Sequence, residues 1–85
     1  MEVFLKHSKS KGKWTKVKNL NEAVIKVRQF IRKHNCGGID IEPVWVGGEV
    51  RHNGKEIAFI SYNGKVWDVQ DKEIRDPWQL NFWKV

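Results

Sequence analysis

The clearest hydrophobic pattern is helical and lies in NLNEAVIKVRQFIRKHNCGG. At about 100° per residue its apolar side chains share one stripe, with charged residues outside it. The members of the stripe are Leu20, Ala23, Val24, Val27, Phe30 and Ile31. Asn19 or Asn21 can cap the start, and Gly37 and Gly38 can supply a left-handed stop. The pattern predicts an amphipathic helix over about 20–35, with one core face and one basic face.

A two-residue alternation precedes the helix. EVFLKH (2–7) places Val3 and Leu5 on one face, and WTKVK (14–18) alternates again. The intervening SKSKG is typical of a turn, with Gly12 free to take positive φ. We therefore predict a lysine-rich β-ribbon. As an unpaired edge, strand 2–7 offers a second copy a place to pair, so a homodimer is one possible assembly.

Two Asn-Gly pairs follow the helix, at Asn53-Gly54 and Asn63-Gly64. Asn-Gly between alternating apolar runs is the strongest short-range hairpin signal. Together they predict a three-stranded meander over about 48–52, 55–62 and 65–69.

Two-residue turns would fix the pairing of these strands, with Arg51 opposite Glu56 and Ile60 opposite Trp67. Both faces of the meander then carry apolar residues. One predicted face has Val50, Ile57, Phe59 and Val66, and the other has Ala58, Ile60, Tyr62, Trp67 and Val69.

The remaining segments are assigned by the same rules. IDIEPVWV (39–46) alternates, with Pro43 marking an edge or a bulge. DVQDKEIRD (68–76) is polar and indicates a connecting loop, and DPWQLNFWKV (76–85) has the alternation of a strand that would cover the second face. The whole chain, 1–85, is expected to form one α+β domain with the helix on a twisted antiparallel sheet of four to six strands.

Charge is distributed unevenly along the chain. The net charge is +6, yet residues 1–35 hold ten lysines and arginines against two glutamates, a net +8. Such asymmetry favours oriented attraction to an anionic surface. A single cysteine, Cys36, and the lack of an apolar segment after Met1 predict a cytoplasmic protein without a membrane partner.

The basic segment therefore provides the candidate site. Lysines suit phosphate contact because they are mobile point charges on long stems, and binding gains from counterion release. A tryptophan among them can stack on an unpaired base. The candidate binding residues are Lys9, Lys11, Lys13, Trp14, Lys16, Lys18, Arg28, Arg32 and Lys33. The alternative is that the lysines only keep the protein soluble and Trp14 belongs to the core.

Other chemistry has weaker support. His34 and Cys36 are two possible metal ligands, but a closed zinc site needs four. Asp40 and Glu42 lie two apart on one predicted strand face, which is more typical of a solvated face. A further set of aromatic residues either forms an exposed platform or supplies a second core layer, and a domain this small favours the core layer. These residues are Trp45, Tyr62, Trp67, Trp78 and Trp83. We expect no catalytic residues, no metal and no cofactor.

The stretch GGEVRHNGKEIAFISYNGKVWD (47–68), after a helix ending in RQFIRKHNCGG, resembles small accessory proteins of phages and plasmids. This resemblance implies a mobile-element origin and assigns no functional residues. A helix followed by three antiparallel strands also resembles the double-stranded-RNA-binding domain, although here strands precede the helix.

Two functions follow. The first is a non-enzymatic module that binds the phosphate backbone of DNA or RNA. The second is an inhibitor, of the anti-CRISPR or a similar anti-defence type, that docks on an acidic surface of a nucleic-acid-handling protein.

Overall fold

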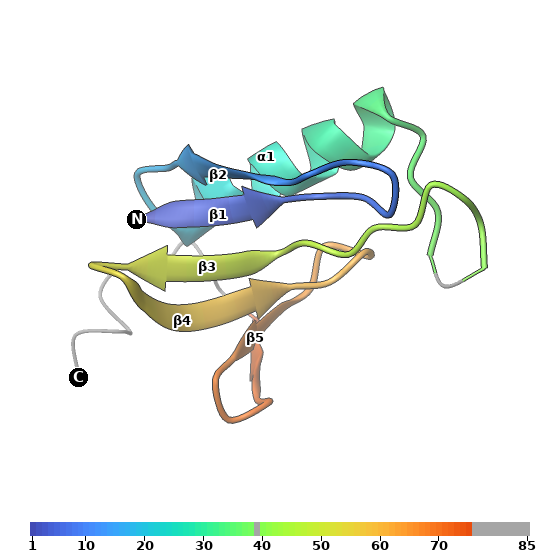
Figure 1. Ribbon diagram of the computed structural model, residues 1–85. Helices are drawn as coiled ribbons and strands as arrows, with labels where there is room; N and C mark the ends of the chain where they lie inside the picture. The colour runs from blue at the N-terminus through green and yellow to red at the C-terminus, as the bar shows by residue number, and fades with distance from the viewer. Residues whose placement is uncertain (39, 76–85) are drawn as a thin grey trace.

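The computed structural model describes residues 1–38 and 40–75, which form one helix on a six-stranded antiparallel sheet (Figure 1). The strands are β1 (Glu2–Leu5), β2 (Lys13–Lys16), β3 (Glu49–His52), β4 (Lys55–Ile60), β5 (Val66–Asp68) and β6 (Glu73–Ile74), and the helix is α1 (Leu20–Lys33). Their spatial order is β2-β1-β3-β4-β5-β6. The predicted α+β class and the lysine-rich ribbon are confirmed.

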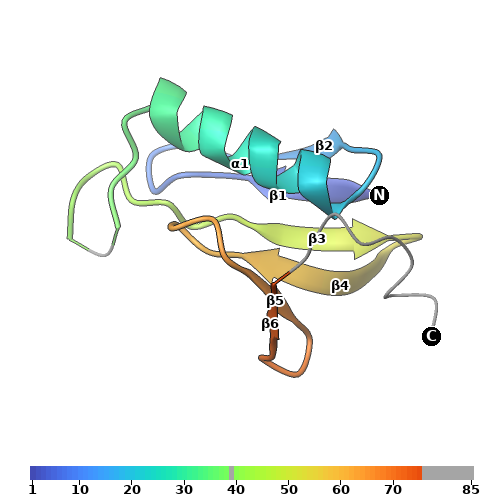
Figure 2. The same ribbon diagram turned by 180° about the vertical axis from the view of Figure 1, so that it is seen from behind.

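The helix covers one face of the sheet, and no other described helix or strand covers the opposite face. Figure 1 looks onto the face without the helix, and Figure 2 shows α1 in front of the sheet, across β1 and β2. The core lies between these two layers because the apolar stripe of α1 meets the inward residues of the strands. Its buried members are Val3, Val17, Leu20, Ala23, Val27, Cys36, Trp45, Val50, Ala58, Ile60 and Val66.

Both ends of α1 are fixed by asparagines. Asn19 caps the start, and its Oδ1 accepts a hydrogen bond from the Glu22 N–H at 2.8 Å. At the other end Asn35 has a φ of 51°, and Cys36 N–H donates to the Ile31 carbonyl at 2.9 Å. This is a Schellman ending with asparagine in the left-handed position. The prediction that Gly37 and Gly38 would supply the left-handed stop is wrong.

The meander forms, with one hairpin in the predicted register and one shifted. Arg51 pairs with Glu56 as predicted, and Asn53 and Gly54 between these strands both have positive φ. In the second hairpin, however, Ile60 pairs with Val66 rather than with Trp67. The reason is a longer loop: Gly64 N–H donates to Ser61 O, and Ser61 N–H donates to Lys65 O, the pattern of a three-residue turn with a left-handed glycine.

The predicted assignment of meander side chains to the two faces is also wrong, partly because of this longer loop and partly because of a bulge in β3. A bulge between Val50 and Arg51 makes Val50 pair with Ala58 instead of Ile57. A one-residue slip sends every following side chain to the other face. Consequently Val50, Ala58, Ile60 and Val66 are buried together on the α1 side. Phe59, predicted to share a face with Val50, is 38% exposed.

Three further sequence predictions need correction. β1 is internal, paired with β2 on one side and β3 on the other, so strand 2–7 is not an edge. The strand predicted over 39–46 is not formed in its described part, where residues 40–46 make only single bridges, Gly37 with Val44 and His7 with Trp45. The supposed loop 68–76 contains β6. The strand predicted over 76–85 lies outside the described residues.

Candidate nucleic-acid interface

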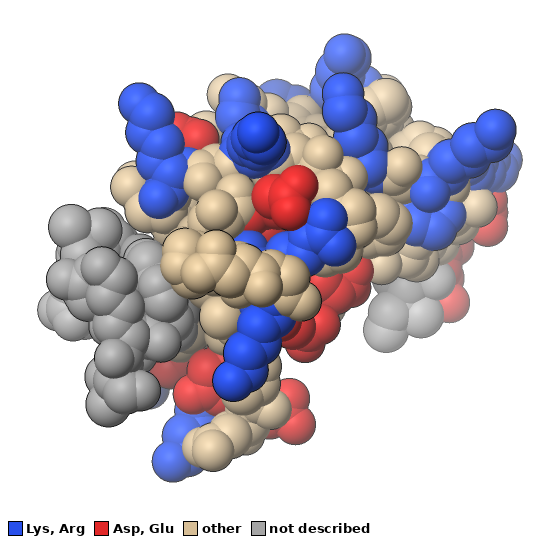
Figure 3. Space-filling view, turned by 60° about the vertical axis from the view of Figure 1, so that its left-hand side comes forward, with Lys and Arg blue, Asp and Glu red and all other residues tan. Residues whose placement is uncertain are grey.

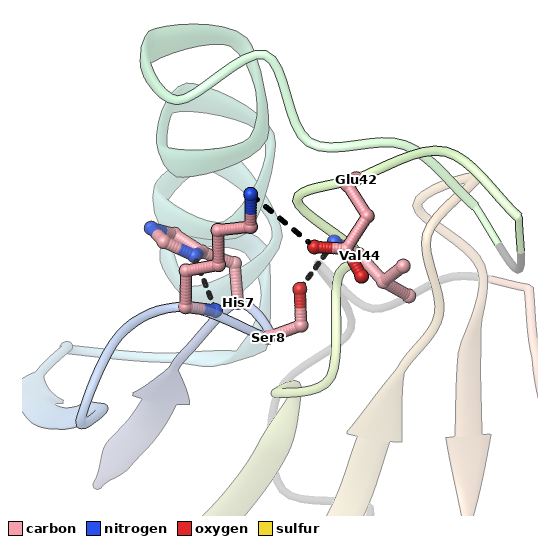
Figure 4. Close-up of polar contacts among 5 residues, drawn as sticks. His7, Ser8, Glu42 and Val44 are labelled. Atoms are coloured by element: carbon pink, nitrogen blue, oxygen red, sulfur yellow. Dashed lines mark hydrogen bonds and ion pairs between the residues drawn. The ribbon is translucent and has the colours of Figure 1, made fainter.

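The candidate lysines belong to a ribbon, defined here as residues 2–18, whose turn is pinned in place. In Figure 4 the turn meets the segment that precedes β3: Ser8 N–H donates to the Val44 carbonyl at 2.8 Å, and Val44 N–H donates to Ser8 Oγ at 2.9 Å. Lys9 Nζ lies 3.5 Å from Glu42 Oε2, and the Lys9 N–H donates to His7 Nδ1. The ribbon turn is therefore a supported surface.

Two lysines of the ribbon already have partners within the chain. Lys9 is paired with Glu42, although both side chains are well exposed. Lys6 Nζ donates to the carbonyl of Ser10 and so ties the strand to its own turn. Among the described residues the remaining ribbon lysines form no ion pair with a carboxylate, and all four are exposed. They are Lys11, Lys13, Lys16 and Lys18.

The alternation of β2 divides these lysines between the two faces of the sheet. Lys13 pairs with Leu5, which packs against the core, so its side chain lies on the α1 side. Lys16 pairs with Glu2, and Trp14 pairs with Phe4, on the opposite face. The predicted site residues are thus not one continuous surface.

Trp14 is partly enclosed on that opposite face. Its ring lies 5.0 Å from the Phe4 ring between centroids, and the Arg51 guanidinium carbon lies 3.7 Å from its ring centroid. Arg51 Nε also donates to Glu2 Oε1 at 2.9 Å. Since a guanidinium already occupies one side of the indole, Trp14 is less available for stacking on a base than its sequence context predicts.

The helix presents cations on two flanks. Residues four apart lie above one another on a helix, which places Arg28 and Arg32 on one flank. Both line a surface hollow with Tyr62 of the β4–β5 turn. Lys33 is turned away from Arg32 by about 100° and so lies on the other flank, towards the ribbon. Figure 3 shows most of the visible basic side chains in the upper part of the molecule, where α1 and β2 lie in Figure 1.

The side opposite α1 has a different chemistry. We call it the open face; by strand register its members are Glu2, Phe4, Trp14, Lys16, Glu49, Arg51, Glu56, Phe59, Trp67 and Glu73. Burial raises the pKa of the Glu49 carboxyl, its own backbone N–H lowers it, and the nearby charge of Glu56 raises it further. No carboxylate of this face except Glu2 has an ion-pair partner among the described residues. The open face is therefore aromatic and acidic.

The described residues contain no arrangement of three or more His, Cys, Asp or Glu side chains suited to a metal. His34 and His7 come together in a ring cluster with Phe30, at 4.4 and 5.8 Å from its centroid, while Cys36 is buried and its pKa is raised by that burial. Within residues 1–38 and 40–75, no helix has the length and apolar character needed to cross a membrane.

Comparisons of the chain with protein-family models, with curated proteins and with solved structures find no match. The resemblance of residues 47–68 to phage and plasmid accessory proteins therefore stays a prediction. Tyr62 and Asn63 accompany Arg28 and Arg32 in the hollow. The sequence favours a core position for Tyr62 over an exposed platform, yet Tyr62 is 46% exposed, and the sequence predicts no role for the Asn63 side chain. The available signal was Asn63-Gly64, which marked the turn but not its length.

Proposed function

We propose that the protein is a non-enzymatic module that binds the phosphate backbone of nucleic acid. The observation that carries this proposal is the set of exposed ribbon lysines that form no ion pair with any described carboxylate. When lysine side chains of this kind neutralise phosphates, they release the cations condensed on the nucleic acid, and this release favours binding.

The contact surface is the α1 side of the molecule together with the ribbon edge. Lys11, Lys13 and Lys18 approach from the ribbon, and Lys33 approaches from the facing flank of α1. Arg28 and Arg32 extend the surface on the far flank. Lys9 contributes less because Glu42 already lies beside it.

A salt titration tests the proposal. Binding of the whole protein to DNA and RNA oligonucleotides is measured by fluorescence anisotropy from about 50 to 200 mM salt, and the affinity should fall steeply on a log–log plot. The loss of each phosphate-contacting lysine should reduce the slope by about one. A protein that binds neither nucleic acid at the lowest salt would not have this function.

A second candidate is a protein-binding inhibitor that docks on a nucleic-acid-handling enzyme. It is favoured by a specific observation, the exposure of Phe59 at 38% and of Tyr62 at 46%, because aromatic side chains anchor protein interfaces. The ribbon would then meet an acidic patch of the enzyme. Affinity capture with and without nuclease separates the two functions: a single partner that survives nuclease treatment supports the inhibitor, and loss of all captured material supports the backbone binder.

A further inference from the structure

A surface hollow lies between α1 and the β4–β5 turn. Its lining among the described residues consists of Arg28, Ile31, Arg32, Tyr62 and Asn63, and its volume is about 230 Å³. Two of these residues belong to the predicted binding set, and the others come from the turn or the edge of the helical stripe. The hollow is thus built from two elements that meet only in the folded protein.

The two arginines bring like charges together beside the hollow. They lie four residues apart on one flank of α1, a spacing at which like charges destabilise a helix. Neither forms an ion pair with a described carboxylate, and no carboxylate is among the described lining residues. Planar guanidinium groups bind phosphate with paired hydrogen bonds. An anion at this position would offset the repulsion between them.

The turn adds an aromatic ring beside the arginines. Tyr62 is 46% exposed, and its ring lies near the backbone of Gly38, where an added Cβ would be 3.8 Å from Tyr62 Cδ1. The ring therefore has the Gly38 backbone beside it and remains partly exposed. Base-on-aromatic stacking needs such a ring and tolerates any base.

Asn63 supplies a polar group next to the ring. Its Oδ1 accepts hydrogen bonds from Ser61 Oγ and from the Lys65 N–H, which fixes the side chain against its own turn. The Nδ2 group makes no hydrogen bond to another described residue. It is left to donate to an acceptor on a bound molecule.

We propose that this hollow binds one unpaired nucleotide of a single-stranded nucleic acid, with the base on Tyr62 and its phosphate between Arg28 and Arg32. The inference rests on the proposed function and narrows it to single strands. A duplex satisfies the ribbon lysines equally well, but its bases are stacked inside the helix and do not reach the tyrosine.

The test compares a single-stranded oligonucleotide of about ten nucleotides with its own duplex, by anisotropy at about 50 mM salt. Wild-type protein should prefer the single strand. Tyr62→Ala should lower single-strand affinity about 5- to 100-fold and leave duplex affinity unchanged. Tyr62→Phe, which keeps the ring, should retain the preference and shows that loss does not arise from misfolding. Lys13→Gln should lower the affinity for the single strand and for the duplex by the same factor.

The outcomes separate the inference from the function on which it rests. If wild-type protein binds neither ligand, the proposed function and this site are both wrong. If it binds both ligands but Tyr62→Ala leaves single-strand affinity unchanged, the backbone function stands and the nucleotide site is overturned.

Discussion

The two faces of the sheet carry opposite chemistry, although the same short strands supply both. On the α1 side, Lys13 stands beside a helix whose flanks are basic. On the open face, the carboxylates of Glu49 and Glu56 lie close enough for one charge to raise the pKa of the other. Alternation along a strand is sufficient to make this division. A lysine count alone therefore overstates the binding surface, because the face decides which lysine meets phosphate.

The largest change in nucleic-acid affinity is expected when positive charge on the α1 side is replaced by negative charge. Arg28→Glu with Arg32→Glu replaces two cations with two anions and should lower nucleic-acid affinity by at least about tenfold. Anisotropy at low salt measures the change. Glu56→Lys, compared with Arg28→Glu alone, is the matched control on the open face, and it should not raise affinity comparably; an equal and opposite gain would show that total charge, and not the face, governs binding.

Arg51 is a cation of the open face that we expect to stabilise the fold and not to bind phosphate. It donates to Glu2 at 2.9 Å and covers Trp14 at 3.7 Å. Arg51→Ala should lower the free energy of unfolding by about 1 kcal/mol, as measured by urea denaturation, with little change in nucleic-acid affinity. Lys55→Ala, at the exposed first position of β4, should change neither the free energy of unfolding nor the affinity. A large affinity loss for Arg51→Ala in folded protein would place phosphate on the open face.

Lys13 and Lys16 form a matched pair on opposite faces of one strand. Lys13→Gln removes a cation from the α1 side, and we expect affinity to fall about threefold at low salt with a shallower salt slope. Lys16→Gln should have a smaller effect, since Lys16 stands opposite Glu2 on the acidic face. Parallel salt titrations measure both. Equal losses would contradict the division.

The smallest expected effect concerns the partly buried carboxyl of Glu49 on the open face. Because its folded-state pKa is raised, the folded protein binds a proton more readily than the unfolded chain, and stability falls as pH rises from about 4 through that raised pKa. Glu49→Gln should remove this decline and raise the free energy of unfolding slightly at neutral pH, because solvent screens a carboxyl that is only partly buried. Thermal unfolding at several pH values measures it, and an unchanged pH profile would contradict the assignment.

Sequence periodicity was sufficient for α1 and the ribbon because each buries one regular stripe. It failed at the helix end because asparagine, like glycine, tolerates the left-handed conformation that Asn35 adopts. It failed in the meander because nothing in the residues around Val50 and Arg51 signals a bulge.

The sequence predicts which residues of the candidate site are basic, but it does not predict where the fold places them. The basic residues are visible in the sequence, but their division between faces depends on the pairing of Lys13 with Leu5 and Lys16 with Glu2. Asn-Gly is compatible with both a two-residue and a three-residue turn. The longer turn at residues 61–65 places Tyr62 beside Arg28 and Arg32. The hollow could therefore be recognised only from the three-dimensional structure.

The most direct test of the divided surface is an NMR titration of isotope-labelled protein with a single-stranded oligonucleotide at low salt. The amide shifts of Lys13, Arg28, Arg32 and Tyr62 should move together and saturate, while those of Phe59 and Trp67 stay in place. Shifts concentrated at Phe59 and Trp67, with the α1 side unchanged, would contradict the account.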